Sequence, residues 1–106
     1  MLKFFPARAV REASAYSLAG GVALHDNPLA QHWPGAPACF KRSPRAGHLM
    51  DQDKERLIAN ARRFGVRKIV VSAKGTKGQH VDLCGKPYER ALAECVDEPA
   101  QKELAI

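Results

Sequence analysis

The chain has 106 residues, of which 45% are hydrophobic and 26% are charged, and its formal net charge is +6. This length fits one small domain, and the hydrophobic share is large enough for a core, which excludes a disordered tail. No apolar run approaches the roughly 20 residues that cross a bilayer, so we expect no membrane partner. Three cysteines cannot all pair and have no metal-binding spacing, which predicts a reduced, cytoplasmic protein.

Basic charge is concentrated in the middle of the chain. Residues 41–90 carry thirteen basic residues against five acids, a net charge of +8, whereas residues 1–40 carry +1 and residues 91–106 carry −3. This pattern is typical of a polyanionic partner such as nucleic acid, although an arginine-rich surface without a partner explains it equally well. The candidate residues for anion or nucleic-acid binding are Lys41, Arg42, Arg45, Arg63, Lys74 and Lys77.

The first half of the chain predicts a helix, a strand and a long loop. These cover residues 6–19, 21–24 and 27–47, respectively. Pro6 suits the first turn of a helix, and Gly20 suits its C-terminal cap. Four prolines in the loop exclude a helix or a central strand there. A loop of this length is usually functional or disordered.

The second half predicts two helices and two strands. The helices cover residues 52–64 and 87–96, and the strands cover residues 67–72 and 79–83. Asp51 precedes the first of these helices as its N-cap. Ile69, Val70 and Val71 are consecutive, which is typical of a strand buried on both faces.

These elements predict a small α/β domain with a mixed sheet of about three strands and flanking helices. The domain covers residues 21–96, preceded by an N-terminal extension over residues 1–20 and followed by an acidic tail over residues 97–106. The strand–helix–strand segment from Val22 to Val71 predicts parallel strands with a right-handed crossover.

Three histidines lie within three residues of an aspartate. The pairs are His25 with Asp26, His48 with Asp51, and His80 with Asp82. With parallel first and second strands and a hairpin before the third strand, all three pairs meet at one sheet edge. In open α/β sheets, ligands bind at this edge, beyond the carboxyl ends of the parallel strands.

Such a cluster could hold a divalent metal, with carboxylates favouring magnesium or manganese and imidazoles favouring zinc. We expect Asp26, Asp51 and Asp82 to bind the metal, and His48 and His80 to act as catalytic proton carriers. Each residue also has a structural interpretation. Asp51 could serve as a helix cap and nothing more. Asp26 could serve as a turn residue before a proline, and His80 and Asp82 could be ordinary surface residues.

The same residues resemble a family of short bacterial and phage proteins, a domain of unknown function. Its pattern has a strand ending in Asp-Asp-Pro, a tryptophan-containing loop, a His-Leu-x-x-Asp segment and a His-Tyr-Asp-Leu segment. The matching segments are Asp26-Asn27-Pro28, Trp33, His48-Leu49-Met50-Asp51, Ala61 to Gly65, His80-Val81-Asp82-Leu83 and Arg90-Ala91-Leu92. The resemblance covers residues 22–95, with His25 where the family has its first acid. It implies that the His–Asp elements belong together, and it brings no established activity.

We therefore expect metal-assisted hydrolysis of a phosphoester, such as one in nucleic acid, as the first hypothesis for the function. The alternative is a non-enzymatic module that binds nucleic acid through the basic residues of 41–90. A third hypothesis is a phage or plasmid accessory protein that binds another protein through the loop containing Trp33.

Overall fold

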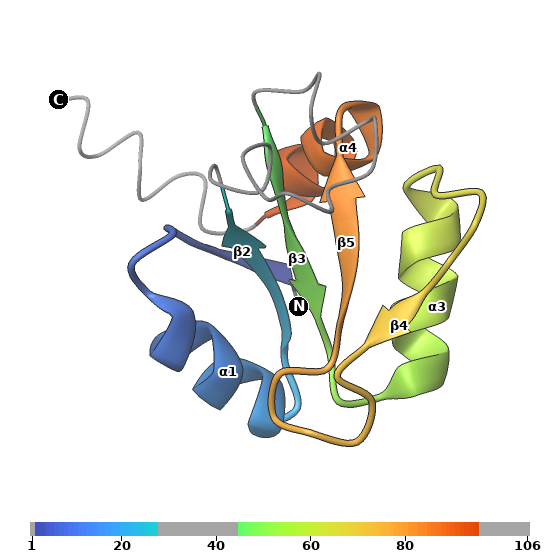
Figure 1. Cartoon of the computed structure of the whole chain (residues 1–106). Coiled ribbons are helices and arrows are strands. Elements are labelled where there is room, and N and C mark those ends of the chain that lie inside the picture. Colours follow the sequence, from blue (N-terminus) through green and yellow to red (C-terminus); the bar gives the residue numbers. More distant parts are fainter. Residues whose placement is uncertain (1, 28–44, 96–106) are drawn as a thin grey trace, which may run out of the picture.

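The computed structural model describes residues 2–27 and 45–95. The elements are β1 (Leu2–Phe5), α1 (Val10–Leu18), β2 (Val22–Asp26), β3 (Ala46–Met50), α3 (Lys54–Arg63), β4 (Val71–Ser72), β5 (His80–Cys84) and α4 (Lys86–Glu94). The strands form one mixed sheet in the order β1-β2-β3-β5-β4 (Figure 1). The α/β class is therefore confirmed, but the sheet has five strands rather than about three. The predicted loop and tail lie largely outside the described residues.

The first strand and helix belong to the sheet domain, in contrast to the predicted extension over residues 1–20. β1 runs parallel to β2, with Leu2 opposite Val22 and Phe5 opposite His25. Phe5 is buried, and α1 begins at Val10 rather than near Pro6. A strand of four residues before a proline carries little local signal, because its stability comes from pairing with a distant segment.

The predicted parallel unit from Val22 to Val71 is wrong. β2 lies between β1 and β3, whereas β4 lies at the far edge and pairs antiparallel with β5. The parallel pair is instead β1 with β2, which α1 connects in sequence. Only Val71 and Ser72 pair in the strand predicted over residues 67–72, and Val70 is 60% exposed. The short edge strand therefore contains Val71 and Ser72, and Ile69 and Val70 lie just before it.

A central strand replaces the predicted end of the long loop. β3 pairs antiparallel with β2 on one side and with β5 on the other, so His48 lies in the middle of the sheet. Helix α3 begins at Lys54, and its N-cap is Asp53, whose carboxylate accepts a hydrogen bond from the Arg56 backbone N–H at 3.1 Å. The prediction that Asp51 caps this helix is therefore wrong by two residues.

Helices cover both faces of the sheet, because the strand side chains alternate between two separate cores. On one face, α3 and α4 pack against the larger core. It contains Val22, Leu24, Leu49, Leu57, Ala61, Phe64, Val81, Leu83, Tyr88, Ala91 and Cys95. On the other face, α1 packs against a smaller core of Phe5, Ala13, Ala23 and Met50. The smaller core covers only part of its face and leaves room for polar side chains.

Candidate metal centre

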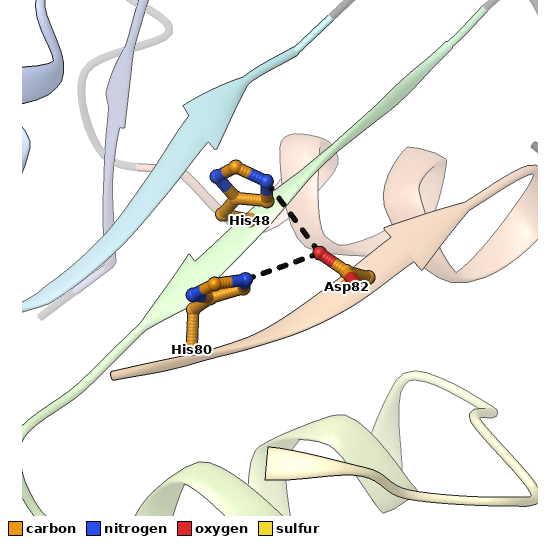
Figure 2. A group of neighbouring side chains, drawn as sticks. All are labelled: His48, His80 and Asp82. Carbon is orange, nitrogen blue, oxygen red and sulfur yellow. Dashed lines mark ion pairs between the residues drawn. The ribbon is translucent and has the colours of Figure 1, made fainter. Parts of the chain in front are cut away.

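Three polar side chains gather on the sheet face that α1 partly covers: His48 from β3, and His80 and Asp82 from β5 (Figure 2). The antiparallel register places His48 directly opposite Asp82. His80 lies two residues before Asp82 and therefore on the same face of β5. The alternation of the two central strands thus brings the three side chains together.

The three groups are within reach of one ion. The Oδ1 atom of Asp82 lies 3.5 Å from Nε2 of His48 and 3.3 Å from Nε2 of His80. One ligand atom from each residue lies within 4.8 Å of the other two. The side chains are 19% to 32% exposed, so the cluster is accessible from solvent. These residues could hold a metal ion through two imidazoles and one carboxylate.

Hydrogen bonds orient both imidazole rings. Nδ1 of His80 donates to the carbonyl oxygen of Gly78 at 2.7 Å, which leaves Nε2 facing Asp82. Histidine ligands of metals commonly have this arrangement, in which the second ring nitrogen donates to a backbone carbonyl. The side-chain amide of Asn27 lies 3.2 Å from Nε2 of His48, the same nitrogen that faces Asp82, so a metal ion bound at Nε2 would replace this hydrogen bond.

The cluster separates the protonation states of its members. Burial, together with the charge of His80, lowers the pKa of His48 from 6.5 to about 4, although Asp82 opposes this shift. Burial also acts to lower the pKa of His80, but hydrogen bonds to Asp82 and to the Gly78 carbonyl outweigh it and raise that pKa. Burial acts to raise the pKa of Asp82, and the hydrogen bond and charge of His80 outweigh it and lower that pKa. Near neutral pH, His48 is neutral and Asp82 is ionised.

A third histidine extends the cluster towards β1. His25 lies opposite His48 in the register, and their ring centroids are 5.6 Å apart, compared with 4.3 Å between His48 and His80. Nε2 of His25 donates to the carbonyl oxygen of Ala7 at 2.9 Å. Its Nδ1 is buried and has no hydrogen-bond partner among the described residues. Three imidazoles thus lie side by side across three neighbouring strands.

Two of the predicted metal ligands lie elsewhere and have other partners. Asp51 is fully buried, and both of its carboxylate oxygens accept hydrogen bonds from the Arg56 guanidinium, at 2.6 and 2.8 Å. Asp26 accepts a hydrogen bond at 2.7 Å from the hydroxyl of Tyr88 on α4, which belongs to the larger core. The five predicted His and Asp residues therefore do not converge at one edge. The structure brings three of them together on a face.

The predicted anion-binding residues are dispersed. Arg45 lies over the ring of Tyr88, and Arg63 forms an ion pair with Glu94 of α4. Lys74 and Lys77 are exposed in the turn before β5. Lys41 and Arg42 lie outside the described residues. The described members of this set therefore form no single patch.

Sequence reasoning placed His25 near the other two histidines without naming it as a site residue, and it missed Asn27 as a hydrogen-bond partner of His48. Both residues follow the alternation of β2, because Ala23, His25 and Asn27, the residue directly after the strand, are spaced at a period of two. These signals can be interpreted only when β3 is known to pair with β2. That pairing was not predicted, because His48 was placed directly before a helix rather than in a strand.

A scan against protein-family models found no match, and neither a search of the curated proteins nor a search of the solved structures found a similar protein. The resemblance to the family of unknown function therefore stays a prediction. Among the described residues, no helix is long and apolar enough to cross a membrane.

Proposed function

We propose that this protein binds a divalent transition metal through His48, His80 and Asp82 and uses it to hydrolyse a phosphoester. The observation that carries the proposal is the convergence of two imidazoles and one carboxylate, with ligand atoms within 4.8 Å, on an accessible sheet face. Catalytic zinc sites typically have three protein ligands and keep a fourth position open for water or substrate.

The ligand set favours zinc over magnesium. Imidazole nitrogens suit zinc and other transition metals, whereas magnesium is usually bound through carboxylates, phosphates and water. The lowered pKa of His48 also helps, because a histidine must be neutral to bind a metal. In this proposal His48 and His80 are ligands rather than proton carriers, and of the three aspartates only Asp82 takes part.

The fourth coordination position of such a zinc ion provides the chemistry for hydrolysis. A zinc ion of this kind polarises a phosphoryl oxygen and lowers the pKa of a water molecule that it binds. The net charge of +6 favours an anionic substrate. Arg67 and Lys68 are exposed and form no ion pair within the described part of the chain. A phosphoester is the substrate class that combines negative charge with this chemistry.

Calorimetric titration of the metal-free protein with zinc, manganese, nickel and magnesium tests the proposal. We expect one zinc ion per chain and at least tenfold weaker binding in His48→Ala and in Asp82→Asn. Asp26→Asn is the matched control, because it makes the same substitution at an aspartate that bonds to Tyr88 instead. Zinc binding that is equal in all four proteins would contradict the site.

Hydrolysis of bis(p-nitrophenyl) phosphate by the zinc-loaded protein tests the second half of the proposal. We expect turnover in the wild type and in Asp26→Asn, and its loss in Asp82→Asn. If the protein binds zinc at this cluster but cleaves neither this ester nor a short oligonucleotide, the metal site stands and the proposed hydrolase activity is contradicted.

A further inference from the structure

A groove of about 460 Å³ lies between α1 and the turn that precedes β5. Its lining residues are Val10, Arg11, Ser14, Ala15, Leu18 and Lys77. Five of the six come from α1, and Lys77 comes from the turn on the opposite side. α1 packs on the face of the sheet that carries His48, and Figure 1 shows the turn passing beside this helix. The groove and the candidate metal centre therefore belong to the same side of the molecule.

One wall of the groove exposes apolar surface. Val10 and Leu18 are 48% and 56% exposed, and Val70 is the third strongly exposed large hydrophobic residue among those described. Val10, Ser14 and Leu18 follow each other at intervals of four residues, so they form one stripe along α1. Exposed apolar side chains that gather in a hollow often mark a ligand site.

Two cations line the groove together with this stripe. Arg11 and Lys77 come from separate elements, and no acidic residue lines the groove. Within the described residues neither cation forms an ion pair or a side-chain hydrogen bond. Two uncompensated positive charges beside an apolar wall complement a ligand that carries phosphates and an apolar ring.

We propose that this groove binds a nucleotide of a single-stranded nucleic acid, with phosphates at Arg11 and Lys77 and the sugar and base against Val10 and Leu18. The inference rests on the proposed function, for which it names the substrate class. The turn connects the two regions, since Gly78, next to Lys77, accepts the hydrogen bond that orients His80. A phosphate bound at Lys77 therefore lies next to the segment that holds a metal ligand.

Fluorescence anisotropy with a labelled single-stranded oligonucleotide, in the presence of a chelator, tests the groove separately from the metal. We expect the double variant Arg11→Ala/Lys77→Ala to bind about tenfold more weakly. The slope of log affinity against log salt should become shallower by about 1.4, because two phosphate contacts to a single strand are lost. The matched control is Lys54→Ala/Arg62→Ala, which removes equal charge from exposed positions on α3.

The apolar wall has its own variants. Leu18→Ser should weaken binding about threefold with an unchanged salt slope, whereas Val70→Ser, at an equally exposed position outside the groove, should have no effect. Equal losses in the groove pair and in the α3 pair would overturn the proposal, because binding would then depend on overall charge. The proposal would also be overturned if the protein bound phosphatidylserine vesicles through the groove residues and did not bind the oligonucleotide.

The two proposals can fail independently. If His48→Ala loses zinc but keeps oligonucleotide binding, as we expect, each site has its own residues. If zinc binding and ester hydrolysis are found while the groove variants bind the oligonucleotide normally, the groove assignment fails and the proposed function stands.

Discussion

The two faces of the sheet use the same strands for different purposes. The face under α3 and α4 is filled by large apolar side chains such as Leu24, Leu49 and Leu83, all fully buried. The face under α1 has a smaller core, and the rest of it carries His48, His80 and Asp82, which are partly exposed. Successive residues of one strand therefore contribute to stability and to the candidate site in turn. Polar residues can therefore occupy one face of the sheet without disturbing the apolar packing of the other face.

Adjacent residues of β3 provide the strongest test of this comparison. Leu49 is fully buried on one face, and His48 is partly exposed on the other. Leu49→Ala should lower the free energy of unfolding by about 3 kcal/mol, because it removes buried apolar contacts and leaves a cavity. His48→Ala should lower it by less than about 1 kcal/mol in metal-free protein at pH 7.5. Urea denaturation measures both, and equal losses would show that the two faces do not differ in this way.

The apolar face is the part of the fold that the sequence predicts best. The helical spacing of Leu57, Ile58, Ala61 and Phe64 predicts a buried helix face; Ile58 is partly buried and the other three are buried. The period of two also placed His80 and Asp82 on one face of a strand, as observed. Periodicity within one segment carries this information, because it depends only on which way each side chain points.

The partners of His48 could not be predicted in the same way. They depend on β3 lying between β2 and β5, which is a property of distant segments. β3 has five residues and contains Gly47, so its local strand signal is weak. A Cβ at Gly47 would lie 2.5 Å from the carbonyl oxygen of His25 and 2.6 Å from the ring of Tyr88, so the close approach of both β2 and α4 explains the glycine. A feature that packing requires was thus interpreted as the end of a loop.

Acid titration should sharpen the comparison, because the polar face carries groups with opposite shifts. The folded protein lowers the pKa of His48 from 6.5 to about 4, so the unfolded chain takes up this proton first as the pH falls. The stabilisation is complete above pH 6.5 and is lost towards pH 4, a loss of roughly 2 kcal/mol between pH 7.5 and 4.5. His80 has the opposite sign, because its raised pKa stabilises the fold below pH 6.5 and loses this effect as the pH rises.

NMR titration of the imidazole resonances in metal-free protein checks both signs. His48 should stay neutral until about pH 4, and the midpoint of His80 should lie above 6.5. Urea denaturation of His48→Gln should show a smaller loss of stability between pH 7.5 and 4.5 than the wild type. Identical pH profiles, or a His48 midpoint near 6.5, would show that the cluster does not separate these protonation states.

The smallest expected loss of stability concerns the hydrogen bond between Tyr88 and Asp26, at the edge of the larger core. Tyr88 is fully buried, and its hydroxyl donates to Asp26 at 2.7 Å. Burial and this hydrogen bond raise the pKa of Tyr88, so the hydroxyl stays protonated as a donor. Tyr88→Phe should lower the free energy of unfolding by about 1 kcal/mol, because Asp26 is partly exposed and water replaces the lost partner.

This variant also separates a structural aspartate from a ligand. Tyr88→Phe removes the donor of this hydrogen bond, whereas Asp26→Asn keeps an acceptor oxygen for the hydroxyl and should lose less stability in urea. Both should keep the wild-type affinity for zinc, because the bond lies with the apolar core rather than among His48, His80 and Asp82. If Asp26→Asn lost zinc affinity while Tyr88→Phe kept it, the carboxylate of Asp26 would reach the metal, and the division between the two faces would not hold at this end of β2.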